Sequence, residues 1–370
     1  MGEGRHVGAA SEGLPRERMR RPLRKLAENL RDLVVPSEVP RKPAKNVSPL
    51  EFMRDFVAAS QPVVLTGLSS KDWPCLSRWT KEYLLDKVGD LEVSVNVTPD
   101  GLGDFVEERT GLFVKPLEDR MTFRDFWSAL DPAEGRPAGD RDVHYLSRQN
   151  DSLREELPSL MEDVPQAVPL GTAAFGNEPE AVNLWIGDSR AVSSCHKDHY
   201  ENLYVVVQGE KVFTLLPPAA APFLAERRCQ PAHFERRGGR LEVVRDEPSS
   251  PDVPWVPVDV ANPDLGRYPD FDPGLAVQVR VRPGEMLYLP AMWYHQVAQE
   301  GITVAVNYWH DMPFGHGYVH HEFIRDVMLL NDDSDEVDEP QADKGASCPG
   351  EGRCSGTDGC PDCRSREATM

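Results

Sequence analysis

The sequence predicts a mainly β chain of the α+β class, with a jelly-roll core (a double-stranded β-helix) and helices packed outside it. From residue 181 onward, short apolar runs of strand length alternate with Gly and Pro. The chain holds 33 Pro and 28 Gly, so turns are frequent. Helix-like segments are concentrated before residue 181. A helix-bearing half followed by a half of short strands is typical of an α+β chain with a sandwich or barrel core.

Residues 1–45 are predicted to form a basic extension with one amphipathic helix. Four leucines recur at helical spacing behind Pro22: Leu23, Leu26, Leu30 and Leu33. We expect this helix to dock on the core. The alternative is a basic targeting or membrane-surface helix.

Two further helices have recognisable starts. Ser48 fits the N-cap position, Pro49 the first helical position, and Glu51 completes a capping box. Thr122 with Asp125 opens a second helix, "FRDFWSAL". Strands are predicted at "QPVVLTGL", "LEVSVNVTPDG" and "VHYLS". The second of these alternates, so its valines should face the core and its Glu, Ser, Asn and Thr side chains should face solvent.

The second half reads as consecutive strands, with Gly209 as a turn between two of them. The runs are "AVNLWIG", "HYENLYVVV", "EKVFTLL", "LAVQVRVRPGEMLYLP", "YHQVAQ" and "GITVAVNYW". A Pro-rich insertion, about 219–273, interrupts them, and "YVHHEFIRDVMLLN" predicts a last helix. The jelly-roll domain is therefore assigned to residues 46–330, and residues 331–370 to an acidic, then Cys-containing, disordered tail.

Charge and hydropathy exclude several classes of protein. The net charge of −20 argues against nucleic-acid binding and would suit a basic peptide or protein partner. No apolar run has membrane-spanning length, and the first residues lack the apolar stretch of a secretory signal. No membrane association is therefore expected.

The cysteines indicate a reducing compartment. Seven is an odd number, and Cys75, Cys195 and Cys229 lie outside the tail, so no disulfide framework is predicted. We expect a cytoplasmic protein, or one that is also nuclear. Of the tail cysteines only the last two have ordinary zinc spacing, so a disordered tail is favoured over a zinc knot: Cys348, Cys354, Cys360 and Cys363.

A candidate metal site lies at "SCHKDHYENLY". On a strand, residues two apart share a face, so His196 and Asp198 project together while His199 points away. Two His and one carboxylate are the ligands of non-haem Fe(II) oxygenases. The candidate third ligand is His295, at a strand start. The alternatives are a chance His-X-Asp match, His199 as the functional histidine, and His295 as a core residue.

The flanking residues carry a more specific signal. "HYENLYVVVQGEKVFTLLPP", "RPGEMLYLPAMWYHQV" and "VAVNYW" together resemble the Jumonji-C (JmjC) family of Fe(II)- and 2-oxoglutarate-dependent oxygenases. The chain is most similar to the small protein-hydroxylase branch, and within it to the short lysyl hydroxylases. The resemblance spans residues 46–325 and includes "AVNLWIGDSRAVSSCHKDHYENLY" and "VPWVPVD".

The resemblance implies specific ligands. The iron ligands fall on His196, Asp198 and His295, and the lysine that pairs with the distal carboxylate of 2-oxoglutarate falls on Lys211. A point cation on a rigid strand suits a terminal carboxylate. The alternatives are that Lys211 is an exposed hairpin lysine and that an arginine on the strand before His295 binds the carboxylate: Arg280 or Arg282.

The resemblance also implies further cosubstrate and substrate contacts, on less specific matches. Those that match cosubstrate contacts are Tyr145, Ser193 and Asn202, where Ser193 replaces the usual Thr and lacks its methyl group. Asn307 matches an asparagine near the metal, and an asparagine inside an apolar strand requires a partner. Tyr294 and Trp309 are candidates for the substrate mouth. Tyr145, Tyr294 and Trp309 could equally be core aromatics.

The implied activity is protein hydroxylation with Fe(II), 2-oxoglutarate and O₂. The implied target is C-3 of a lysine in a partner protein, such as a translation-associated GTPase. The alternatives are an N-methyl-lysine demethylase and a non-catalytic cupin-like binding module. No His-Glu-X-X-His peptidase motif is present. The last helix has an apolar face that in related hydroxylases packs against a second copy, so a homodimer is also implied.

Overall fold

The computed structural model describes residues 16–130, 142–149 and 151–332. The chain divides into two compact units, residues 1–335 and 336–370, and all described residues belong to the first unit. The four tail cysteines, for which a disordered tail was predicted, lie outside the described residues.

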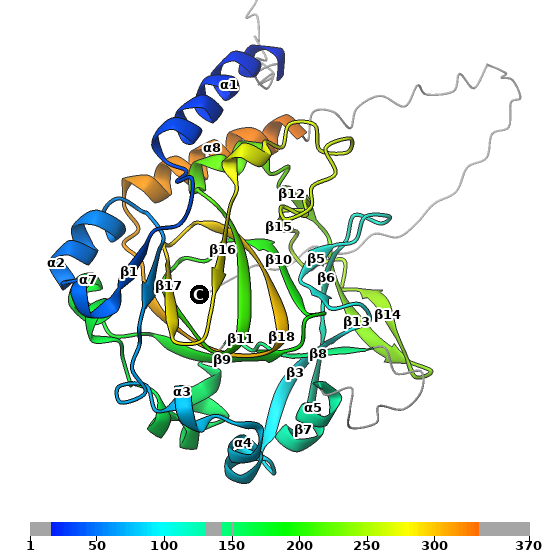
Figure 1. The fold of residues 1–370 in the computed structure, drawn as a ribbon. Coiled ribbons are helices and arrows are strands. Elements are labelled where there is room, and N and C mark those ends of the chain that lie inside the picture. Colours follow the sequence, from blue (N-terminus) through cyan, green and yellow to red (C-terminus); the bar gives the residue numbers. More distant parts are fainter. Residues whose placement is uncertain (1–15, 131–141, 150, 333–370) are drawn as a thin grey trace, which may run out of the picture. The chain divides into compact units, whose positions relative to one another are not determined.

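The core of the first unit is a 12-stranded sheet that curls into a barrel (Figure 1). Its main path follows the order β1 (Arg41–Pro43), β2 (Val63–Thr66), β17 (Glu285–Leu289), β11 (Tyr200–Leu216), β18 (Tyr294–Asp311), β9 (Ala181–Gly187), β8 (Val143–Leu146), β3 (Glu92–Thr98) and β7 (Leu117–Thr122). Off this path lie β10 (Val192–His196), which pairs with β18 and β4 (Leu102–Gly103), and β16 (Val277–Val281), which pairs with β11. The predicted mainly β core is confirmed.

The insertion that the sequence analysis placed at about 219–273 contributes four strands of its own. They form two small sheets with two earlier strands: β12 (Arg227–Cys229) pairs with β15 (Val253–Trp255), and the order of the other sheet is β14 (Arg240–Arg245), β13 (Pro231–Arg237), β6 (Phe113–Lys115) and β5 (Phe105–Val106). The insertion is therefore structured, and β15 brings an aromatic side chain to the site described below.

Helices pack outside the barrel (Figure 1). They are α1 (Arg16–Leu33), α2 (Pro49–Phe52), α3 (Cys75–Arg78), α4 (Lys81–Val88), α5 (Phe123–Leu130), α6 (Ser152–Glu155), α7 (Pro169–Phe175) and α8 (His316–Asp332). Among the described residues, no helix is both long enough and apolar enough to cross a membrane.

The predicted helix starts at Ser48 and Thr122 are confirmed. The backbone N–H of Glu51 donates to the Ser48 hydroxyl at 3.2 Å, and that of Asp125 donates to the Thr122 hydroxyl at 3.1 Å. Each side chain satisfies a donor that the first turn of a helix leaves free.

The predicted helix behind Pro22 exists but begins earlier. Helix α1 starts at Arg16 and carries Pro22 inside it, so the prediction that the helix begins behind this proline was wrong. Ala27 and Leu30 are buried against the insertion, which confirms docking on the core. Leu33 is 79% exposed and does not belong to the packed face.

The half-buried prediction for β3 holds for its buried valines and its exposed Glu92, but it was wrong for Ser94 and Thr98, which are buried. Their hydroxyls have partners there: Arg148 donates to Ser94, and the N–H of Gly101 donates to Thr98. A hydroxyl paired in this way can be buried without the cost of an unsatisfied polar group.

Gly209 is not a turn between two strands. Strand β11 continues through it, and the pairing with β18 shifts register on both sides of Gln208. Gly209 has φ +70°, which fits a bulge that lets β11 follow the curvature of the barrel. Similarly, "YHQVAQ" and "GITVAVNYW" form one strand, β18.

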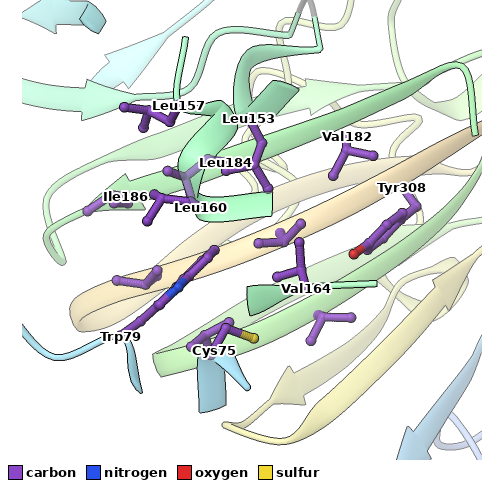
Figure 2. Packing of buried hydrophobic residues seen from close by; sticks show 14 of the residues in the cluster. Cys75, Trp79, Leu153, Leu157, Leu160, Val164, Val182, Leu184, Ile186 and Tyr308 are labelled. Carbon is purple, nitrogen blue, oxygen red and sulfur yellow. The ribbon is translucent and has the colours of Figure 1, made fainter. Parts of the chain in front are cut away.

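Two apolar clusters lie on opposite faces of the curled sheet. The larger packs the outer face against helices and includes Leu184 and Ile186 of β9 with Leu153 of α6, as Figure 2 shows. The second lines the barrel interior and includes Tyr204 and Phe213 of β11. The interior cluster forms the floor and wall beside the polar residues of the site.

We expect Gly209→Ala to lower the free energy of unfolding by roughly 2–4 kcal/mol, through a left-handed backbone and a steric clash. An added Cβ would lie 2.6 Å from the carbonyl oxygen of Ile302. The matched control is Gly238→Ala, where φ is +56° and nothing lies within 4 Å of the added atom. This control should lose about 1 kcal/mol. Urea unfolding measures both, and equal losses would contradict the bulge argument.

Candidate metal and cosubstrate site

Strand β10 ends at His196, and β18 begins one residue before His295. The two histidines are direct partners in the β10–β18 register, and their ring centroids are 4.2 Å apart. Asp198 lies 4.0 Å from Nε2 of His196 and 3.5 Å from Nε2 of His295. One potential ligand atom from each residue lies within 4.8 Å of the others. The structure thus brings together the three residues of the predicted triad.

Both imidazoles are oriented by backbone carbonyls. Nδ1 of His196 lies 2.7 Å from the carbonyl oxygen of Ser194, and Nδ1 of His295 lies 2.9 Å from that of Trp293. Protons on Nδ1 leave the Nε2 lone pairs directed at Asp198, which is how protein metal sites fix the histidine tautomer. Burial, together with His196, lowers the pKa of His295 to about 4, so its imidazole is neutral and able to ligate at pH 7.

The backbone that brings His196 and Asp198 together differs from the predicted continuous strand. The strand stops at His196, so Asp198 lies in the connection to β11 and not on a continuous strand face. A hydrogen bond of 2.9 Å from the N–H of Met292 to the carbonyl oxygen of Asp198 holds this connection. His199 points elsewhere and stacks on Phe314, with ring centroids 6.0 Å apart.

Lys211 is buried in the barrel interior and is not an exposed hairpin residue. Its ammonium donates to the Tyr145 hydroxyl at 2.9 Å and to the side-chain oxygen of Gln299. Within the described part of the chain it has no carboxylate partner, and burial lowers its pKa to about 7. A buried ammonium without a counter-ion is costly. This lysine is therefore suited to bind an anion.

The two alternative arginines are engaged elsewhere. Arg280 pairs with Glu210 and Glu300, and Nε of Arg282 lies 3.0 Å from Glu210. These pairs are partly exposed to solvent. Neither arginine lines the cavity at the triad.

The positions predicted to contact the cosubstrate surround Lys211 and the triad. Tyr145 hydrogen-bonds with Ser193 and Tyr204, and burial raises the Tyr145 pKa. Asn202 is buried, and its side-chain oxygen accepts from the Asn307 amide at 3.1 Å.

Asn307 supports the site from behind. Its amide donates to Asn202, and its oxygen accepts from the Trp185 indole at 2.8 Å. Both polar ends of this fully buried side chain are therefore paired, which removes the cost of placing an asparagine inside an apolar strand. Asn307 does not line the cavity, whereas Asn202 and Trp185 do.

Only one of the two aromatic candidates for the substrate mouth lines the cavity. Trp309 lines the cavity together with His295 and stacks on Tyr200, with ring centroids 4.8 Å apart. Tyr294 does not line it. It is fully buried on the other face of β18, where its hydroxyl donates to Glu226 at 3.0 Å. The assignment of Tyr294 to the mouth is therefore wrong, because it neighbours His295 and points the opposite way.

A cavity of about 240 Å³ opens beside the triad. The sequence analysis missed two residues of this region, Trp255, which lines the cavity, and Gln299, which contacts Lys211. Trp255, from β15 in the insertion, lies parallel to the His196 ring at 6.0 Å and donates its indole N–H to the Ser194 hydroxyl at 3.0 Å. Gln299 holds Lys211 and in turn donates to the carbonyl oxygen of Asp188 at 2.7 Å. The sequence could have predicted Gln299, because it lies four residues after His295 on one strand and residues an even number apart share a strand face.

Comparison with known proteins gives one family and several relatives. Residues 49–316 match the cupin-like domain family. A human protein named bifunctional peptidase and (3S)-lysyl hydroxylase JMJD7 is 41% identical over 83% of this chain and 95% of its own length.

Two further relatives come from distant organisms. JmjC domain-containing protein E of Dictyostelium discoideum is 34% identical over 82% of this chain and 92% of its own length. Lysine-specific demethylase JMJ32 of Arabidopsis thaliana is 36% identical over 84% of this chain and 92% of its own length. The similarity therefore covers the barrel, the triad and Lys211 in a single stretch.

Proposed function

Because this chain belongs to the cupin-like domain family, with JmjC relatives along most of its length, we propose that it is an iron- and 2-oxoglutarate-dependent protein hydroxylase that acts on lysine. The observation that carries the proposal is the presence of two features in the barrel interior, where Tyr145 lines the cavity at the triad and contacts Lys211. One is a His/His/Asp triad with both Nε2 atoms turned inward, and the other is the buried, uncompensated Lys211.

The residues fit the group that the family implies. His196, Asp198 and His295 would hold Fe(II), since two imidazoles and one carboxylate leave open positions on the metal. Lys211 and Tyr145 would receive the distal carboxylate of 2-oxoglutarate. Ser193 and Asn202 would flank the cosubstrate, and Asn307 would orient Asn202.

When bound, iron, 2-oxoglutarate and O₂ supply an oxidation in which one oxygen atom enters a C–H bond as hydroxyl and the other enters succinate, with release of CO₂. The protein's own residues orient the reactants. The carbonyls at Ser194 and Trp293 fix the two imidazoles, and the interior apolar cluster limits the access of water to Lys211.

The proposed target is C-3 of a lysine in a partner protein, in line with the printed name of the human relative. A second candidate is N-methyl-lysine demethylation, which the name of the Arabidopsis relative favours. A non-catalytic module is disfavoured, because the three candidate ligands and the buried lysine are all in place.

Mass spectrometry of a cell extract treated with the protein, Fe(II), ascorbate and 2-oxoglutarate tests the proposal. We expect a lysine-bearing peptide to gain about 16 Da, which is one oxygen atom. A loss of about 14 Da would identify demethylation instead. No change at any lysine, with 2-oxoglutarate unconsumed, would contradict both activities.

The proposal also includes a homodimer and a reducing cellular compartment. Val319 and Phe323 of α8 are 60% and 68% exposed, so this helix offers an apolar face to a second copy of the chain. The described cysteines are free and buried, in keeping with a reducing compartment such as the cytoplasm or nucleus: Cys75, Cys195 and Cys229.

A further inference from the structure

Asp104 is a carboxylate on the wall of the cavity beside the triad, and the proposed chemistry does not use it. It lines the cavity together with His196, Asp198 and Trp255. It lies between β4 and β5, far from the ligands in sequence. Its presence at the site therefore depends on the fold.

The backbone that carries Asp104 is fixed to the strand that carries His196. Strand β4 runs parallel to β10, with Gly103 paired to Ser193. The Ser194 hydroxyl donates to the backbone carbonyl of Asp104, and the same hydroxyl accepts from Trp255. The backbone of Asp104 is thereby held next to the strand that ends at His196.

This position requires an unusual backbone. Asp104 has φ +51°, a left-handed conformation that residues with a side chain rarely adopt. Gly101, three residues earlier, has φ +93°, and a Cβ there would lie 1.9 Å from the carbonyl oxygen of Arg190. Backbone strain that directs a side chain into a cavity is typical of functional sites.

Among the described residues the Asp104 carboxylate has no hydrogen bond or ion pair, and the charged groups that act on it are His196 and Lys115. Lys115, a nearby cation, is held by Asp246 at 2.7 Å. Lys197 also lines the cavity, but its ammonium lies 3.7 Å from Glu226 and over the Tyr294 ring, on the other face. Burial raises the pKa of Asp104, and the charges of His196 and Lys115 offset part of this rise.

The wall next to Asp104 is aromatic. The Trp255 ring is held flat against His196 by its hydrogen bond to Ser194. A lysine side chain has an apolar stem and a terminal ammonium, so it can lay its methylenes on an indole face while its charge reaches a carboxylate. The cavity thus offers both halves of a lysine-binding site.

We propose that Asp104 binds the ε-ammonium of the substrate lysine, with its stem against Trp255, and so selects lysine over uncharged side chains. This inference rests on the proposed function, because it assigns the substrate subsite of the same cavity. It makes Asp104 a specificity-determining residue that touches substrate and not a ligand of the metal.

Binding can be tested apart from turnover. The probes are N-acetyl-lysine methylamide and N-acetyl-norleucine methylamide, which differ in the charged end group. Each is titrated without oxygen into the full chain loaded with Mn(II) and 2-oxoglutarate, and paramagnetic broadening of the probe's methylene protons reports proximity to the metal. We expect the wild type to prefer lysine by about tenfold or more, and Asp104→Asn to bind both probes alike.

The matched control is Glu108→Gln, which makes the same charge change four residues away. The Glu108 side chain is 72% exposed and pairs with Arg267 outside the cavity, so its loss should leave the preference unchanged. Metal content and 2-oxoglutarate affinity of Asp104→Asn should equal those of the wild type, which distinguishes lost recognition from a damaged site.

The possible results separate the inference from the proposed function. A lysine preference that persists in Asp104→Asn, or that is absent from the wild type, overturns the inference. An equal loss of both probes in Asp104→Asn also overturns it, since that result indicates a structural role. A preference that depends on Asp104, without hydroxylation of any lysine in the extract, supports the inference and contradicts hydroxylation.

Discussion

Asp198→Ala is expected to abolish turnover and to leave the fold nearly intact. The variant would leave two imidazoles, His196 and His295, to hold Fe(II), and the carboxylate that lies within 4.0 Å of both would be lost. We expect an activity more than about 100-fold lower, since even partners of metal ligands contribute 10- to 100-fold. Iron retained after dialysis and the initial rate of 2-oxoglutarate consumption measure the effect, and the melting temperature checks the fold.

The control for this prediction is the neighbouring histidine. His199 stacks on Phe314 and meets Tyr318 of α8 edge-on, away from the triad, so His199→Ala should keep activity within about threefold of the wild type. Retained iron and activity in Asp198→Ala would remove Asp198 from the site. A folded but inactive His199→Ala would show that the histidine was assigned incorrectly.

The local part of the site could be predicted from sequence, and the distant part could not. His196 and Asp198 are two residues apart, so almost any extended backbone turns them to one side. The third residue, His295, becomes their neighbour through the β10–β18 register, which is a long-range pairing. Spacing alone left His295 open as a core residue, and the family resemblance was needed to select it.

Lys211 shows why the alternation of side chains between the two faces of a strand cannot be followed across a bulge. On β11, Tyr204 faces the barrel interior, and Lys211 lies an odd number of residues later, so an unbroken strand would turn it outward. The bulge at Gly209 changes the parity and turns Lys211 and Phe213 inward. A lone glycine in an apolar run indicates a turn equally well, which is why the sequence predicted one.

The errors at the aromatic positions have a similar origin. Tyr294 was assigned to the site because it adjoins His295, yet adjacent strand residues face opposite ways, and its true environment is Glu226 and the apolar cluster under α1. Trp255 was missed as a site residue because it belongs to the insertion. Its position depends on the pairing of β15 with β12, which has no local signal.

Lys211→Met is expected to weaken 2-oxoglutarate binding and to leave metal binding unchanged. Lys211 is 1% exposed, and a bound carboxylate would be its charge partner. Loss of a buried, hydrogen-bonded charge pair costs roughly 2–5 kcal/mol, or about 30-fold to several-thousand-fold in affinity. Methionine keeps most of the stem volume, so the packing loss should be small.

Lys211→Arg is a stricter test of the pocket's shape. Arginine keeps the charge, but its planar fork is larger than an ammonium held between Tyr145 and Gln299. We therefore expect weaker 2-oxoglutarate binding than in the wild type, with a smaller loss than in Lys211→Met. Isothermal titration without oxygen, with Mn(II) in place of Fe(II), measures both variants.

The pH dependence supplies a second, independent signature of Lys211. Burial lowers the pKa of the free protein's Lys211 to about 7, whereas a bound carboxylate favours the ammonium and raises that pKa in the complex. Affinity should thus be full below pH 7 and fall as the pH rises, by up to about tenfold per unit, because binding then requires proton uptake. In Lys211→Met this dependence should vanish. Unchanged affinity in Lys211→Met, or a wild-type affinity that stays constant between pH 6 and about 9, would remove Lys211 from the cosubstrate site.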